Sequence, residues 1–178
     1  MKYRYGWISL ALLALSCQNS PAKQLQQLHD DKDNGLVQEK RINNTVVTCS
    51  YLPAGWERKM SDEPDVGTVE GMSFEVNITS ADKADLIQKG SHQMASYGLD
   101  TVFQLIYDQD TLPPLLAQRV ANGNVGGIVY LVTFDRRTLE QGSKLTFVYK
   151  DWLFTATRLT FPLQINLLQQ SDSLSLKL

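Results

Sequence analysis

Cysteine and histidine, the side chains best suited to nucleophilic, acid-base or metal chemistry, are rare in this chain. It contains Cys17, Cys49, His29 and His92, which are well separated in the sequence. Catalytic and metal sites combine such groups in defined arrangements that leave recognisable spacings. The chain has no H-E-x-x-H, G-x-S-x-G or G-K-[ST] motif. We therefore expect no catalytic residue, no metal ligand and no cofactor.

Two groups of acidic residues lack the spacing of a cation site. The stretch 30–35 fails the calcium-loop template, because a lysine or a misplaced glycine falls on a required position in either register. Asp108 and Asp110 flank Gln109 in a predicted turn, where aspartate commonly bonds the local backbone. We interpret both groups as solvated or turn-forming charge.

The amino terminus has the pattern of an export signal. Lys2 and Arg4 precede an apolar run over residues 7–15, which is too short to span a bilayer. The string Leu13-Ala14-Leu15-Ser16-Cys17 resembles the lipobox of bacterial lipoproteins, in which the cysteine after the cleavage site is acylated. The resemblance implies a cleaved signal peptide over residues 1–16, lipidation of Cys17 and a lipid-anchored protein of the bacterial cell envelope. Gln18 after the cysteine resembles the outer-membrane sorting signal of proteobacterial lipoproteins, so we expect the protein at the outer membrane.

The charge of the mature chain limits the classes of partner it is expected to bind, and its cysteine content limits the disulfides it can form. Without Lys2 and Arg4, 15 of the 17 basic residues remain against 19 acidic ones, a net charge of −4. Nucleic acid is therefore not an expected partner. If Cys17 carries lipid, Cys49 has no partner for a disulfide within the chain. Because Cys49 ends a β-branched run, we predict that it is buried and packs as a small hydrophobic side chain.

Residues 17–41 have the composition of a linker. They are rich in Gln, Lys, Asp and Asn and contain Pro21 and Gly35. We predict a flexible tether with a reach on the order of 25–30 Å. A short amphipathic helix around Lys23–His29 is the alternative, although its two leucines offer little to anchor it.

From residue 42 onward the pattern becomes that of strands. Polar and apolar residues alternate over 72–79, which predicts a half-buried strand, and residues 81–89 after Ser80 favour one short helix. The run 128–134 is apolar on both faces and is expected at the centre of the core. Further strands are predicted at Thr101–Tyr107, Thr111–Val120, Lys144–Tyr149 and Leu159–Leu167.

These elements predict an all-β domain over residues 42–178, an antiparallel β-sandwich of seven to eight strands with one short helix. A closed barrel is the alternative, since periodicity does not distinguish two packed sheets from one curled sheet. Pro113 and Pro114 should kink the second arm of a hairpin or place it at a sheet edge. Residues 174–178 alternate again and predict an edge strand, either frayed or donated to another subunit.

Three aromatic residues, Tyr51, Trp56 and Trp152, lie in or next to predicted turns. Such rings either close the ends of a sandwich or bind a sugar or a pocket on a partner.

The runs 103–134, 147–151 and 159–163 are similar to those of uncharacterised lipoproteins of Bacteroidota. That resemblance implies an envelope protein with an all-β domain and carries no catalytic residue with it.

The expected function follows from the leader and from the missing catalytic motifs. We expect a non-catalytic envelope lipoprotein, attached to the membrane through its lipid, that binds a protein partner or stabilises an envelope complex. One alternative is a glycan-binding lipoprotein that uses the three aromatic residues. The other is a hydrolase of an envelope polymer, which would need two acids from distant strands to converge in space.

Overall fold

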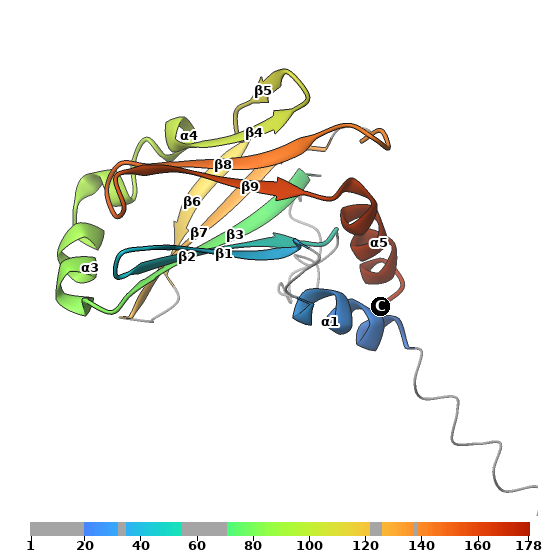
Figure 1. Ribbon diagram of the computed structural model, residues 1–178, viewed down its shortest axis with the longest axis horizontal. Coiled ribbons are helices and arrows are strands. Elements are labelled where there is room, and N and C mark those ends of the chain that lie inside the picture. Colours follow the sequence, from blue (N-terminus) through green and yellow to red (C-terminus); the bar gives the residue numbers. More distant parts are fainter. Residues whose placement is uncertain (1–19, 32–34, 55–70, 122–125, 137–138) are drawn as a thin grey trace, which may run out of the picture.

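The computed structural model describes residues 20–31, 35–54, 71–121, 126–136 and 139–178. These residues form nine strands in two antiparallel sheets that face each other (Figure 1). The predicted all-β sandwich is confirmed, although the strands outnumber the seven or eight expected and several short helices accompany them.

The first sheet has five strands, and its centre is where the sequence predicts it. Strand β3 carries the alternating residues, with Phe74, Val76 and Ile78 fully buried, and the apolar strand β7 lies between β3 and β6. In spatial order the strands are β1 (Val37–Ile42), β2 (Thr45–Leu52), β3 (Gly71–Ser80), β7 (Gly127–Asp135) and β6 (Leu116–Val120).

The second sheet has four strands, and its hairpin is shorter than predicted. Only β5 pairs back on β4, after which Pro113 and Pro114 interrupt the chain and β6 pairs with β7 in the other sheet. Proline has no N–H for a ladder, so the two prolines end the pairing and the chain changes sheets. In spatial order the strands are β5 (Asp110–Leu112), β4 (Phe103–Tyr107), β8 (Leu145–Asp151) and β9 (Thr157–Leu163).

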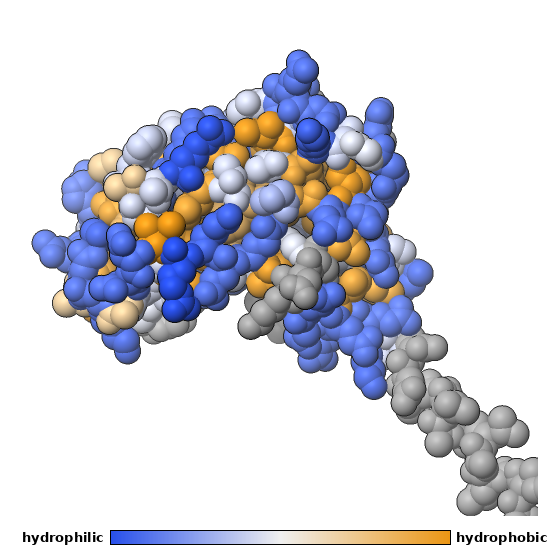
Figure 2. All heavy atoms as spheres, in the orientation of Figure 1, coloured by the Kyte–Doolittle hydropathy of each residue, from blue (hydrophilic) through white to orange (hydrophobic). Residues whose placement is uncertain are grey.

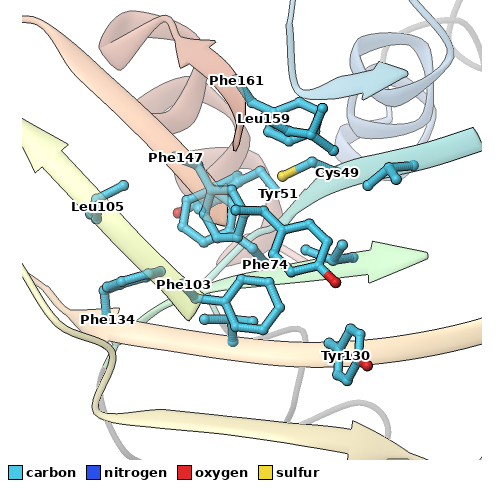
Figure 3. Packing of buried hydrophobic residues seen from close by; sticks show 14 of the residues in the cluster. Cys49, Tyr51, Phe74, Phe103, Leu105, Tyr130, Phe134, Phe147, Leu159 and Phe161 are labelled. Atoms are coloured by element: carbon cyan, nitrogen blue, oxygen red, sulfur yellow. The ribbon is translucent and has the colours of Figure 1, made fainter. Parts of the chain in front are cut away.

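Aromatic rings fill the space between the sheets, with Phe147 of β8 in the middle (Figure 3). Its ring centroid lies 4.9 Å from that of Phe74 and 5.9 Å from those of Phe103 and Phe134. Cys49 is buried against the same core, as predicted, and burial raises the pKa of its thiol. A thiol in this environment is protonated and shielded from reagents.

Along the seam between β1 and β9, apolar atoms of the core lie between polar side chains (Figure 2). The Gln38 amide of β1 donates to the Pro162 carbonyl oxygen of β9 at 2.7 Å. The Lys40 ammonium lies 5.9 Å from the centroid of the Phe161 ring. These polar groups of β1 bridge the seam, so the two sheets are joined at this edge by side chains.

Helix α3 (Lys83–Gly90) is the helix expected after Ser80, shifted by two residues. Its N-cap is Asp82, which accepts a hydrogen bond from the Asp85 amide at 3.0 Å, while Ser80 accepts from the Asp82 amide. Lys89 pairs with Asp85 at 2.8 Å in the last turn. A 3₁₀ turn, η1 (Gln93–Ala95), and the short helix α4 (Leu99–Val102) then lead into β4.

The segment expected to be a flexible tether differs from that prediction in its described part. Pro21–Asp30 forms helix α1, capped by Ser20, and Val37–Ile42 is strand β1. Leu25 is buried, and Leu28, one turn further, packs against the core. Two leucines suffice here because helix α5 supplies the surface that covers them, which an isolated peptide would lack.

The carboxyl end also differs from the prediction. The expected long strand stops at Leu163, and Ile165–Ser175 forms helix α5 in place of further strand. The buried positions Ile165, Leu168, Ser171 and Leu174 recur every three residues and line one helix face. The predicted edge strand at 174–178 is therefore wrong, since that segment ends the helix. No helix of the described residues is long and apolar enough to cross a bilayer.

Candidate functional site

The connection between β8 and β9 is built around the buried carboxylate of Asp151, which is 1% exposed. One carboxylate oxygen accepts hydrogen bonds from the amides of Leu153 and Phe154 and from the Tyr149 hydroxyl, at 2.9–3.2 Å. The other accepts from the amide and hydroxyl of Thr155 at 2.8 and 2.7 Å. Five donors satisfy this acid, so its role is to hold the turn.

This turn places Trp152 on the surface while Phe154 is buried below it. Trp152, the one tryptophan among the described residues, is 63% exposed. The Lys89 ammonium at the end of α3 donates to the Phe154 carbonyl oxygen at 3.3 Å. The turn is therefore held from both sides, which presents the indole on a fixed backbone.

A small, largely apolar pocket of about 30 Å³ opens beside this indole. We call it the Trp152 pocket. Its walls come from the β8–β9 turn, from strands β7 and β8 and from the segment between α3 and β4. The lining side chains include Trp152, Met94, Leu99, Val102, Tyr130 and Tyr149. The volume is that of about two water molecules, which suits the end of one aliphatic side chain.

The segment that lines the pocket between α3 and β4 also carries exposed apolar side chains. Met94 lines it and is largely exposed, and Tyr97, which follows η1, is 76% exposed. Tyrosine, tryptophan and methionine are the residues enriched where proteins bind one another. The chain therefore gathers three interface-type side chains within one short stretch and the turn beside it.

A second polar cluster ties helix α5 to the first sheet at the other end of the sandwich. The Asp172 carboxylate accepts from the Tyr51 hydroxyl at 2.7 Å and from Arg136 at 2.6 Å. It also accepts from the Ala54 amide, and Arg136 donates to the Gly71 carbonyl oxygen. The partly buried charges are paired and hydrogen-bonded, so the cluster is a structural clamp.

The three buried tyrosines of the described residues have perturbed pKa values. Burial raises the pKa of Tyr51, Tyr130 and Tyr149 above the ordinary 10.0, and for Tyr51 and Tyr149 the carboxylates of Asp172 and Asp151 add to it. These phenols are protonated at neutral pH. Each is a hydrogen-bond donor within the fold.

We predict that alkaline pH unfolds the domain through these tyrosines. The pKa of each phenol is higher in the folded state than in the unfolded chain. Their contribution to the free energy of unfolding is therefore complete below pH 10 and is lost as the pH rises above it. Urea unfolding midpoints measured between about pH 8 and pH 11 should fall only in the upper part of this range. Tyr149→Phe removes one ionisable group and should make the fall less steep; an equal slope would contradict the assignment.

The three aromatic residues that could either close the ends of the sandwich or bind a sugar or partner do not form one surface in the described residues. Tyr51 lies inside β2 and is 1% exposed, so its ring offers no face to a ligand. Trp152 is at the surface on the β8–β9 connection, which lies at the opposite end of the sandwich from helix α5 (Figure 1). Trp56 and the predicted lipidation site Cys17 lie outside the described residues. No sequence pattern predicted Met94 and Tyr97 as surface residues, because the segment around them has no periodic alternation of polar and apolar residues.

The remaining sequence candidates serve local structure. Asp108 accepts from the Lys144 amide at 2.7 Å, which holds neighbouring turns together, and His92 caps η1. His29 lies on α1, where burial lowers its pKa. Among the described residues, no three His, Cys, Asp or Glu side chains are gathered as a metal ion would need.

Comparisons with known proteins identify no family for this chain. No protein-family model matches it, and no curated protein matches it. A solved structure, a protein of unknown function from Burkholderia pseudomallei K96243, is similar over 88% of this chain and 91% of that chain. The TM-score is 0.43 and the sequence identity is 10%. No functional conclusion follows from this comparison.

Proposed function

We propose that this chain is a non-catalytic, lipid-anchored protein of the bacterial cell envelope that binds a protein partner through the Trp152 pocket. The anchor is the predicted acylation of Cys17, and the expected membrane is the outer membrane. The observation that carries the binding role is an exposed indole, held on a rigid turn, beside an apolar pocket that fits the end of one aliphatic side chain.

Three features of the pocket favour a protein partner. Trp and Tyr are typical of the few residues that dominate the affinity of protein interfaces, and Met is enriched in them. The Asp151 network fixes the turn before binding, so little conformational freedom is lost when a partner docks. The volume of about 30 Å³ suits the end of one aliphatic side chain inserted from a partner.

Glycan binding is the second candidate, and the exposure of Trp152 is the observation that favours it. A flat indole can stack on a sugar ring. Sugar sites also need free polar groups to bond the hydroxyls, whereas the Asp151 carboxylate beside this indole is already occupied by five donors. With Tyr51 buried, the proposed aromatic platform also loses one of its rings.

We predict that a photocrosslinking amino acid at position 152 will form a reproducible protein adduct in the envelope of the native host. The matched control places the same amino acid at Gln118, which is exposed on β6. Adducts should appear at 152 and be absent at 118. The adducted protein, identified by mass spectrometry and purified, should bind the Trp152→Ala variant at least tenfold more weakly, because truncation of a central aromatic typically costs 2 kcal/mol or more.

The variant must be folded for this comparison to be informative. Because Trp152 is mostly exposed, Trp152→Ala should change the free energy of unfolding by less than about 0.5 kcal/mol. Equal adducts at 152 and 118 would contradict a specific site. An adduct that resists protease and is released by glycosidase would show that the partner is a glycan and not a protein.

A further inference from the structure

We infer that the end of the domain formed by α1 and the last residues of α5 lies against the membrane surface, and that the Trp152 pocket faces away from the membrane. This inference rests on the proposed acylation of Cys17. It concerns an interaction surface, with the polar head groups of a phospholipid bilayer as its partner. We call this surface the helical end, defined as Ser20–Asp30 and Leu176–Leu178.

The chain between the anchor and the folded domain is very short. Three residue steps separate Cys17 from Ser20, and an extended chain spans at most 3.3–3.6 Å per residue, so the connection reaches about 11 Å at most. Ser20 already caps α1, accepting from the Lys23 amide at 3.4 Å. A lipid on Cys17 would therefore hold the first turn of α1 within about 11 Å of the acylated residue.

Helix α1 transmits this restraint because it is fixed to the domain. Its Leu25 is buried, Leu28 packs against the core, and the helix contacts α5. The following residues enter β1, which pairs with β2 over its whole length. A domain joined in this way cannot swing on its anchor as one on a long flexible tether would.

The chemistry of the helical end suits an interface between water and lipid. Leu176 and Leu178 are 62% and 47% exposed, and Lys177 lies between them. The carboxyl end of the chain lies next to the start of α1, and the two helices contact each other (Figure 1). Exposed leucines beside a basic residue are typical of segments that rest in the head-group region.

Charge does not oppose this contact. Within the helical end, Lys23 and Lys177 are balanced by Asp30 and the terminal carboxylate of Leu178, so this surface presents no net negative charge to anionic head groups. The β8–β9 connection that carries Trp152 lies at the other end of the sandwich from α1 and α5 (Figure 1). With the helical end on the membrane, the Trp152 pocket points into the surrounding compartment, where a partner can reach it.

Fluorescence quenching tests this orientation with the full-length protein processed by its host. The lipoprotein is purified from membranes and reconstituted into phosphatidylethanolamine and phosphatidylglycerol vesicles that contain head-group nitroxide lipids. A thiol-reactive fluorophore is placed on Leu178→Cys, and the matched control carries it on Tyr97→Cys, which is also exposed and lies two residues before Leu99 of the pocket. Buried Cys49 does not compete for the label.

Quenching should be several-fold stronger at position 178 than at position 97. Mass spectrometry of the N-terminal peptide from the same sample reports the lipid on Cys17 separately. A lipidated peptide with equal quenching at both positions, or stronger quenching at 97, would overturn the orientation and leave the anchor in place. An unmodified Cys17 would overturn both.

Discussion

Replacing Phe147 with alanine should lower the free energy of unfolding by about 4 kcal/mol, because truncation of a fully buried phenylalanine removes apolar contacts and leaves a cavity. The ring is 0% exposed and lies between both sheets (Figure 3). Its neighbours include Phe74 at 4.9 Å and Phe161 at 6.1 Å between centroids. Since these rings come from opposite sheets, no small movement of one strand can close the gap.

Urea unfolding followed by circular dichroism measures this loss. The control Phe147→Leu keeps most of the apolar volume and should cost about half as much. If Phe147→Ala lost less than about 1 kcal/mol, the ring would not be the centre of the core, and the packing of the two sheets as described here would be contradicted.

Replacing Asp151 with alanine should cost about 3 kcal/mol, because a buried carboxylate with several charge-assisted hydrogen bonds disappears and its amide donors remain unpaired. The amides of Leu153, Phe154 and Thr155 all point at this one acid. The same network holds Ala156 at a φ of 51°, in the left-handed region that alanine rarely adopts. Loss of the acid should therefore loosen the whole β8–β9 turn.

A matched control is Asp135→Ala, at the exposed end of β7. It should stay within about 0.5 kcal/mol of the parent, since exposed charges contribute little to stability. Urea unfolding gives both values. Because the turn presents Trp152, Asp151→Ala should also weaken the partner adduct at position 152, whereas unchanged stability and an unchanged adduct would show that the turn is held by other contacts.

These expectations connect stability with the proposed binding role. The core around Phe147 holds the two sheets together, and the Asp151 turn extends from one end of β8 to present the indole. Helices α1 and α5 cover the other end. A substitution at the Trp152 pocket can therefore be tested for binding without loss of the fold, whereas a substitution at Asp151 affects both.

Much of the sheet structure was determined by local sequence pattern. Alternation over 72–79 marked β3, the doubly apolar run 128–134 marked the central strand β7, and the residues after Ser80 marked α3. Such patterns are informative because each strand residue faces either the core or the outside, so its polarity reports its side. Pro113 and Pro114 likewise marked the break in the hairpin, since proline lacks the N–H that a ladder needs.

The helical end was decided by tertiary contacts. Residues 21–30 resembled a linker because two leucines are too few for an isolated helix, and they fold because α5 covers them. Residues 165–175 continue an alternating pattern for a few positions, so the sequence did not separate strand from helix there. The same applies to Tyr51, which the sequence placed near a turn and the structure buries beside Asp172, more than a hundred residues away in the chain.

The Trp152 pocket also depended on the fold. The indole itself was apparent as a residue near a turn, but its exposure depends on the Asp151 network, and the pocket walls come from segments that are distant in the sequence. By itself the sequence determined the leader pattern, the strand polarity and the turns, because these are local properties of the chain. Only the tertiary structure decided which helices form and where an apolar pocket opens, because both depend on surfaces that distant segments supply.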